Sequence, residues 1–276
     1  MPGIKRFQDE TAVVTGAASG IGRATAIALA QQGANLVLAD IQKDRLDVVA
    51  EQIRLLGRPC WPRVVDVSVP GDIENLARFV ESEAGGATIL FNNAGVAMAG
   101  EVVDTSLDDF RWIMGINFWG PLVGIKAFLP AMIQRKHGHI VSTASFMGLC
   151  PTPGTAAYSA TKAAVIALSE ALRQEVRQHN IGVTAICPGV INTSIVESSR
   201  YHEASGGASK ESTVAFYRDR GWPPDRVAQA VIKAIRQNKG IVPVGPEAWA
   251  PWYIKRFSQS LYEWGTQLAW RRIRGD

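Results

Sequence analysis

Cysteine and histidine are scarce in this chain of 276 residues. The three cysteines, Cys60, Cys150 and Cys187, are odd in number and scattered, which favours reduced thiols in a cytoplasmic protein over a disulfide framework. Of the four histidines, His137 and His139 flank one glycine, and no carboxylate or cysteine stands with them at a metal-binding spacing. We therefore expect no metal site.

Long apolar runs and a broad excess of charge are also missing. No stretch reaches the roughly 18–20 apolar residues needed to cross a bilayer, and residues 1–10 are polar and mixed, unlike a signal peptide. The net charge is only +4, and +3 of it falls within residues 249–276. Because a nucleic-acid surface needs a broad basic face, we expect no nucleic-acid partner.

Short β-branched runs alternate with longer helical stretches over most of the chain. The predicted strands are 11–14, 35–39, 63–67, 88–91, 139–143, 182–187 and 240–244. The predicted helices include 21–32, 44–56, 73–82 and 157–179. Strands that are apolar on both faces and separated by helices form a parallel sheet covered on both sides. We predict a doubly wound α/β fold of about seven strands, as one domain over residues 1–248.

A glycine-rich turn joins the first strand to the first helix and reads Thr15-Gly16-Ala17-Ala18-Ser19-Gly20-Ile21-Gly22. Glycines let the chain turn tightly and let a pyrophosphate approach the backbone, and the helix N-terminus offers free N–H groups to its charge. An ordinary turn is the alternative. The position between first strand and first helix favours a dinucleotide site.

Asp40, at the end of the second predicted strand, indicates which dinucleotide binds. A carboxylate there can accept hydrogen bonds from both ribose hydroxyls of the adenosine half, and it repels a 2′-phosphate. Neither Ile41 nor the alanines of the turn supply a cation. NAD is therefore favoured over NADP. The alternative for Asp40 is a helix cap.

Tyr158 and Lys162 open the long predicted helix and, four residues apart, share one helical face. A nearby lysine cation and a positively charged nicotinamide ring would favour the phenolate and lower the tyrosine pKa from its ordinary value of about 10. A Tyr–Lys pair at this spacing is usually a surface pair, so the pair needs further support.

That support comes from a resemblance to the short-chain dehydrogenases/reductases, over roughly residues 8–245. The shared motifs, in order and at family spacing, are Thr15-Gly16-x-x-x-Gly20-x-Gly22, Asn92-Asn93-Ala94-Gly95, Asn117, Ser145, Tyr158-x-x-x-Lys162 and Pro188-Gly189. The resemblance implies a Rossmann-type fold, a nicotinamide cofactor, and a homotetramer or homodimer.

The resemblance also implies a role for each matched residue. Tyr158 would be the general acid–base, and Ser145 would hydrogen-bond the substrate oxygen. Lys162 would hold the nicotinamide ribose and lower the tyrosine pKa, while Asn117 would hold a water linked to Lys162. The implied cofactor contacts are Gly16, Ser19, Gly20, Ile21, Gly22, Asp40, Asp66, Val67, Asn93, Ala94, Gly95, Tyr158, Lys162, Pro188, Gly189 and Thr193.

For five of these residues, the resemblance also implies which part of the cofactor they contact. Asp66 and Val67, which end the third predicted strand, would bracket the adenine. Pro188 and Gly189 would lie beside the nicotinamide. Thr193 would lie near the nicotinamide amide.

Two segments should shape the substrate pocket. Residues 146–153 are apolar and uncharged, and residues 195–223 form a long loop with Gly206-Gly207, as expected of a mobile lid. Because no fixed cation is evident near Ser145, a secondary alcohol or ketone on a largely apolar body is expected. The predicted function is NAD-linked alcohol oxidation or ketone reduction. The alternatives are an NADPH-type ketoacyl or carbonyl reductase and a cofactor-binding sensor without turnover.

Residues 249–276 form a tryptophan-rich, basic extension. Its apolar residues recur at steps of three to five and predict an amphipathic helix: Trp249, Trp252, Phe257, Leu261, Trp264 and Leu268. Packing against its own domain or a neighbouring subunit is favoured. Attachment to a membrane surface is the alternative.

Overall fold

Seven parallel strands form the central sheet of the computed structural model, which describes residues 4–202 and 209–274. Across the sheet they are β3 (Cys60–Val64), β2 (Asn35–Asp40), β1 (Thr11–Thr15), β4 (Ile89–Asn92), β6 (Gly138–Thr143), β7 (Ile181–Pro188) and β9 (Ile241–Val244). The chain builds the sheet from β1 to β3, then returns to β4 on the other side of β1. This reversal leaves a crevice at the carboxyl ends of β1 and β4, where ligands bind in open sheets.

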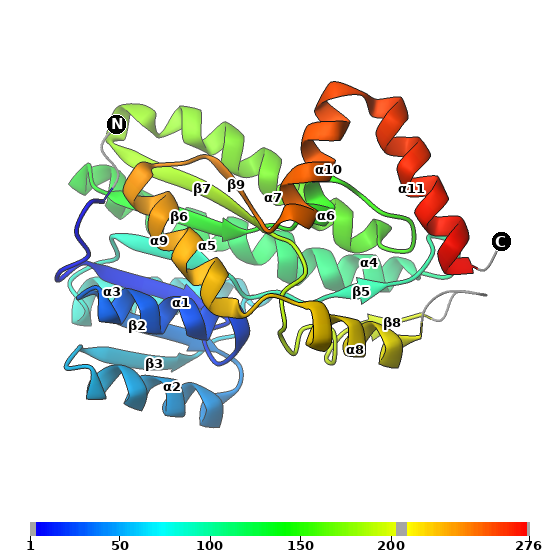
Figure 1. The fold of residues 1–276 in the computed structure, drawn as a ribbon. Coiled ribbons are helices and arrows are strands. Elements are labelled where there is room, and N and C mark those ends of the chain that lie inside the picture. The colour runs from blue at the N-terminus through cyan, green and yellow to red at the C-terminus, as the bar shows by residue number, and fades with distance from the viewer. Residues whose placement is uncertain (1–3, 203–208, 275–276) are drawn as a thin grey trace.

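Helices cover both faces of the sheet, as predicted (Figure 1). One face carries α1 (Gly20–Gln31), α2 (Lys43–Leu55) and α9 (Pro224–Gln237), and the other carries α3 (Pro70–Glu83), α5 (Gly120–Arg135) and α7 (Ala156–Glu175). Alternate residues of a strand enter opposite layers, so Ala12 and Val14 join the first core and Val13 the second. Burial on both faces explains why the strands are nearly continuous apolar runs.

The third strand lies earlier in the chain than predicted. The sequence predicts 63–67, but β3 pairs with β2 from Cys60 to Val64. The strand includes Pro62, and proline lacks an N–H for a sheet ladder. At the edge of the sheet, where β3 lies, one side of the strand needs no such partner and proline is tolerated. Asp66 and Val67 therefore lie in the turn after the strand, not at its end.

The helical middle of the chain contains a local irregularity. α4 (Leu107–Met114) continues through a π-helical turn, Gly115–Trp119, into α5. The continuous run Leu107–Arg135 is long and apolar enough to cross a membrane, which corrects the expectation that no such stretch exists. Core helices of soluble proteins pass the same test. Here Ile125, Phe128 and Met132 of the run pack in the second core against the sheet.

The predicted lid and tail are more structured than their sequences suggest. In the lid region, β8 (Arg200–Tyr201) pairs with β5 (Met98–Ala99), and α8 (Lys210–Arg220) follows; Gly206-Gly207 lies outside the described residues. The tail is two helices, α10 (Pro246–Phe257) and α11 (Gln259–Arg274), which form a hairpin beside the short α6 (Phe146–Leu149) (Figure 1). The proposed boundary at 248/249 thus falls inside α10. The helix predicted over 157–179 ends at Glu175 and is followed by the 3-10 turn Arg177–His179.

His139 is a fully buried histidine in the central strand β6. The Thr184 hydroxyl donates to the carbonyl of Lys239, so it must accept from Nε2 of His139, 2.8 Å away. Among the described residues Nδ1 has no hydrogen-bond partner. Burial, with a smaller contribution from the Arg173 cation, lowers the pKa of His139 to about 3.

We predict that His139 makes the protein acid-sensitive. The His139 imidazole takes up a proton near pH 6.5 in the unfolded chain but only near pH 3 in the native chain. The free energy of unfolding therefore falls as the pH drops from 6.5 to 3, by up to about 5 kcal/mol. Urea unfolding at pH 7 and at pH 5 measures the loss. The His139→Gln variant should show a smaller loss over the same interval. An equal loss in both proteins would contradict the prediction.

Candidate active site

The glycine-rich turn between β1 and α1 lies against the end of β4. Gly16 has φ +64°, and a Cβ on it would stand 2.8 Å from Cα of Ala94. A Cβ on Gly22 would stand 2.0 Å from the carbonyl oxygen of Gly16. Only glycine fits at these two positions. Ser19 is the N-cap of α1 but gives no side-chain hydrogen bond to the helix, so the first-turn N–H groups face the crevice for another acceptor.

Asn93 ties this turn to two neighbouring strands. Its amide nitrogen donates to the carbonyl oxygens of Thr15 and Gly16, at 3.0 and 3.3 Å. Its amide oxygen accepts from the Thr143 hydroxyl at 3.2 Å. The Thr15 hydroxyl in turn accepts the N–H groups of Asn93 and Ala94, both at 3.0 Å. Asn93 therefore shapes the cofactor crevice by holding its walls.

Asp40 sits at the end of β2 with its carboxylate directed to the same turn. One oxygen accepts the N–H of Ala18 at 3.0 Å, and the other accepts the N–H of Gln42 at 3.0 Å. The carboxylate is buried. A dinucleotide whose adenosine ribose reaches this point meets a fixed negative charge, which accepts hydroxyl hydrogens and repels a phosphate.

Asp66 and Val67 lie further along the same crevice. The Asp66 carboxylate accepts from the backbone N–H and the hydroxyl of Ser68, at 2.8 and 2.7 Å, which fixes the turn after β3. Val67 lines a small cavity with Asn92, Ala94 and Gly120, among others. The structure thus brings Val67 close to the end of β4.

Ser145, Tyr158 and Lys162 come together at the carboxyl ends of β6 and β7. Ser145 follows β6 as the N-cap of α6, and its hydroxyl accepts the N–H of Met147 at 3.2 Å. The first turns of α7 carry Tyr158 and Lys162 on one face, with the Lys162 ammonium 5.7 Å from the tyrosine ring centre. The ammonium also donates to the carbonyl oxygen of Thr143 at 2.8 Å.

Burial controls the titration of this cluster. It lowers the pKa of Lys162 to about 8. It raises the pKa of Tyr158 above its ordinary value, and a hydrogen bond with Ser145 opposes this only in part. Desolvation is the largest influence on Tyr158 in the protein by itself, and the expectation that Lys162 lowers the tyrosine pKa stays a prediction. The charge of an oxidised nicotinamide ring belongs to the cofactor and acts only when it is bound.

Asn117 lies in the π-helical turn between α4 and α5 and is fully buried. Its amide oxygen accepts the N–H of Val96 and its amide nitrogen donates to the Val96 carbonyl, both at 2.9 Å. A Cβ on Gly95 would stand 3.1 Å from the Asn117 oxygen and 3.4 Å from the Lys162 nitrogen. Gly95 thus lets Asn117 and Lys162 approach each other. The π-turn aims Asn117 at this point, as such turns often do at functional sites.

The segment after β7 closes the other side of the crevice. Pro188 ends the strand, and the N–H of Gly189 donates to the carbonyl of Val244 at 2.9 Å. Thr193 returns to the glycine-rich turn, where its methyl group would lie 3.1 Å from a Cβ on Gly20. The structure therefore brings the segment after β7 against the glycine-rich turn.

Glu247, in the first turn of α10, supports this segment and was missed by the sequence analysis. Its carboxylate accepts the N–H of Val190 at 3.0 Å. A Cβ on Gly189 would stand 2.4 Å from the same oxygen. The carboxylate also contributes, after burial, to raising the pKa of Tyr217 on α8. Glu247 lies far along the chain from the motif it supports, and no local pattern marks it.

The lid region is attached to the rest of the domain at its base and at its tip. At its base, the N–H groups of Asn192 and Trp222 each donate across to a backbone carbonyl of the opposite segment. At its tip, Arg200 donates to the Asp109 carboxylate at 2.8 Å and lies over the ring of Trp112. A serine hydroxyl and then Arg200 lower the pKa of Asp109. These contacts flank α8, whose Tyr217 lies close enough to Tyr158 to contribute to the rise in its pKa.

The tail holds the loop between Ser145 and Tyr158. The Lys255 ammonium donates to the carbonyl of Leu149 at 2.9 Å, and the Tyr262 hydroxyl donates to the carbonyl of Pro151. The ring of Trp270 lies 3.3 Å from a Cβ built on Gly154. Lys255 is a cation that the tail brings to this loop, at the Leu149 carbonyl. The predicted packing of the tail on its own domain is therefore present on this face.

The three cysteines are free and buried. Cys187 lies close enough to Lys162 for the ammonium to oppose the rise that burial causes in the thiol pKa. Among the described residues no group of three or more His, Cys, Asp or Glu side chains could hold a metal ion.

The fold and this cluster define a class of protein: an α/β dinucleotide-binding protein with a tyrosine, a lysine and a serine at the catalytic end of its sheet. A family profile described as short chain dehydrogenase matches residues 10–204. The chain belongs to the short-chain dehydrogenase/reductase family.

Three similar proteins illustrate the family. The "Probable oxidoreductase EphD" of Mycobacterium tuberculosis is 37% identical over 91% of this chain, which spans only 43% of that relative's length. A C alpha-dehydrogenase from a Sphingobium species is 35% identical, over 85% of this chain and 80% of the relative. A short chain dehydrogenase/reductase from Burkholderia phymatum, solved in complex with NAD, is 30% identical with a TM-score of 0.84, over 93% of this chain and 96% of that one.

We predict that Glu247 holds the Pro188–Gly189 segment through its acceptor oxygen. Glu247→Ala leaves the partly buried Val190 N–H without a partner, at a cost of about 1 kcal/mol, and should lower both thermal stability and cofactor affinity. Glu247→Gln keeps an acceptor oxygen and should stay close to the native protein. Thermal unfolding and cofactor titration of the three proteins measure both effects. Equal losses in the two variants would show that the acceptor is not what matters.

Proposed function

We propose that the protein transfers a hydride between NAD and a secondary alcohol or ketone on a largely apolar substrate, with Tyr158 as general acid–base. The observation that carries the proposal is the convergence of Ser145, Tyr158 and Lys162 at the catalytic end of the crevice that Gly16, Asp40 and Asn93 shape. Family membership supports the reaction class.

The crevice fits a dinucleotide on the evidence of its own atoms. At Gly16 and Gly22 a Cβ would collide with Ala94 and with the Gly16 carbonyl, so glycine keeps the turn tight, and the start of α1 offers N–H groups without a side-chain cap. At one end the Asp40 carboxylate would hold the adenosine ribose hydroxyls. At the other, Lys162 would hold the nicotinamide ribose, beside Pro188 and Gly189. The fixed charge of Asp40 favours NAD over NADP, and the Burkholderia relative was solved with NAD.

When bound, the nicotinamide supplies the hydride acceptor or donor. The Ser145 hydroxyl donates to the substrate oxygen as negative charge develops there in the reduction of a ketone. Tyr158 gives its proton to that oxygen in reduction and takes one in alcohol oxidation. Lys162 is buried, and its ammonium is fixed by the Thr143 carbonyl. It stabilises the phenolate, and it exchanges protons by way of a water that Asn117 would hold. Because burial raises the pKa of Tyr158, the neutral phenol is the resting form, and raising the pH favours oxidation.

The segment after Ser145 supports an apolar substrate. The half-buried Phe146 and Met147 follow Ser145 directly, and the Lys255 ammonium further along the loop is committed to the Leu149 carbonyl. A substrate carboxylate or phosphate would have to displace that bond. The Sphingobium relative is named for the oxidation of a carbon centre, which agrees with an alcohol or ketone substrate.

The other expectations stay predictions. A cytoplasmic location is supported by the three free cysteines. A homodimer or homotetramer follows from the family resemblance. The two alternative functions, an NADPH-type ketoacyl or carbonyl reductase and a sensor without turnover, are separated from the proposal by the two experiments that follow.

We predict that Tyr158→Phe lowers kcat by about 10²–10⁴-fold, because it removes the proton-transferring hydroxyl and leaves the ring in place. Nicotinamide reduction with a panel of apolar secondary alcohols measures the loss. Cofactor affinity, followed by tryptophan fluorescence, is the control and should change little. A native protein that binds NAD tightly and turns over no member of the panel would favour the sensor.

We predict that Asp40→Ala weakens NAD binding by about 10–100-fold, since each charge-assisted hydrogen bond to the ribose contributes about 1.5–3 kcal/mol. The affinity for NADP should rise or stay constant, because the repulsion of its phosphate is gone. Steady-state kinetics with each cofactor gives both ratios, and Asp40→Asn separates the charge from the size of the side chain. A native protein that prefers NADP would overturn the assignment of Asp40.

A further inference from the structure

The α10–α11 hairpin has two apolar faces, and only one of them packs on the domain. Tyr262, Thr266 and Trp270 lie at steps of four on α11 and are its least exposed described side chains. Tyr262 packs with Leu149 and Cys150 in a small core beside α6. This inner face is the one that holds the catalytic loop.

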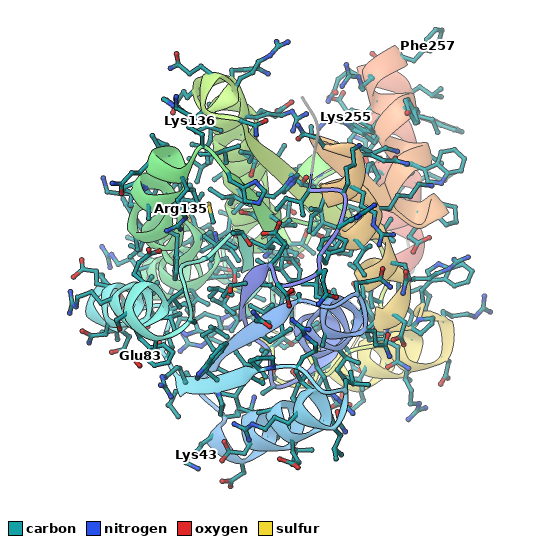
Figure 2. All side chains as sticks on the ribbon, turned by 90° about the vertical axis from the view of Figure 1, so that its left-hand side faces the viewer. Lys43, Glu83, Arg135, Lys136, Lys255 and Phe257 are labelled. Carbon is teal, nitrogen blue, oxygen red and sulfur yellow. The ribbon has the colours of Figure 1, made fainter. Side chains whose placement is uncertain are left out.

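The outer face carries large apolar side chains in solvent. Leu261, Trp264 and Leu268 recur on α11 at steps of three and four, which places them on the side of the helix opposite Tyr262 and Trp270. Among the hairpin side chains whose exposure the structure describes, the exposed large apolar residues are Trp249, Tyr253, Ile254, Phe257, Leu261, Trp264 and Leu268. Phe257 is 91% exposed and lies at the far end of the hairpin (Figure 2). An exposed set of this size marks an interaction surface.

The charge of the hairpin indicates the kind of partner. Residues 249–276 carry five lysines or arginines against one glutamate and one aspartate. Arg256 and Arg271 are exposed, and Arg256 lies over the Trp252 ring. Tryptophan and tyrosine beside arginine is the composition that settles at the boundary between lipid headgroups and acyl chains. Anionic headgroups add an attraction of about 1 kcal/mol for each basic residue near the surface.

A second copy of the same chain fits this face less well. A two-fold contact between two hairpins would bring the same patch on each copy together, and with it two clusters of like charge. An anionic surface is complementary to that charge.

We infer that the outer face of the α10–α11 hairpin docks on an anionic lipid surface. The hairpin lies in the plane of the headgroups, with Phe257 and Trp264 inserted and Arg256 and Arg271 at the phosphates. Its inner face keeps its bonds to Leu149 and Pro151, so docking leaves the catalytic loop in place. The inference concerns attachment and does not depend on the identity of the substrate.

Sedimentation with vesicles tests the inference on the full chain. The native protein should pellet with vesicles of phosphatidylcholine mixed with phosphatidylglycerol, more weakly with phosphatidylcholine alone, and less as salt is added. The double variant Phe257→Ser, Trp264→Ser should bind at least about tenfold more weakly, because two large apolar side chains no longer enter the lipid. The double variant Arg256→Gln, Arg271→Gln should lose the preference for phosphatidylglycerol.

A matched control removes apolar surface elsewhere. Leu55→Ser, Val103→Ser changes two side chains that are 79% and 86% exposed, outside the hairpin, and should bind vesicles as the native protein does. Thermal unfolding of each variant checks that the fold is intact, which is expected because Phe257 and Trp264 are exposed.

Three outcomes would overturn the inference. The first is a native protein that stays in the supernatant with every vesicle composition. The second is equal pelleting of the native protein and the Phe257, Trp264 variant. The third is a drop in oligomer mass in that variant, measured by sedimentation equilibrium, without vesicle binding by the native protein, which would assign the face to contacts between copies of this chain.

Discussion

The side-chain amide of Asn93 joins the carboxyl ends of three parallel strands, and the geometry of the site follows from that. It donates to Thr15 and Gly16 after β1, belongs to the chain leaving β4, and accepts from Thr143 at the end of β6. The Thr143 carbonyl in turn fixes the Lys162 ammonium. One continuous set of hydrogen bonds therefore runs from the glycine-rich turn to the catalytic lysine. The cofactor crevice and the catalytic cluster are held as one unit, which the chemistry of hydride transfer requires.

Burial sets the electrostatics of this unit. Lys162 and Tyr158 are both desolvated, so each is pushed toward its neutral form: the lysine pKa falls and the tyrosine pKa rises. The helical spacing of the pair indicates that the two groups meet, but the direction of the tyrosine shift depends on how much water reaches them. The protein by itself thus holds a neutral phenol. Under the proposed function, the positive charge of a bound oxidised nicotinamide would favour the phenolate.

The two helices that follow β9, α10 and α11, hold segments of the backbone that surround the site. Glu247 holds the backbone after Pro188–Gly189, and Lys255 and Tyr262 hold the loop that connects Ser145 to Tyr158. A single hairpin thereby supports both walls of the catalytic end. Its outward surface stays apolar and basic, so the same element that stabilises the site also offers the contact with a lipid surface.

The amino-acid sequence by itself determined the layered fold and the glycine-rich turn, because strand and helix periodicity and local turn chemistry depend on neighbouring residues. It also singled out Asp40, Ser145, Tyr158 and Lys162, which the structure places at the carboxyl edge of the sheet. It misplaced β3, since only the tertiary structure shows that Pro62 lies in an edge strand. It missed Thr143 and Glu247, and it expected a loop where α8 forms. These depend on contacts between residues distant in the chain, and on the burial that results, which no local pattern encodes.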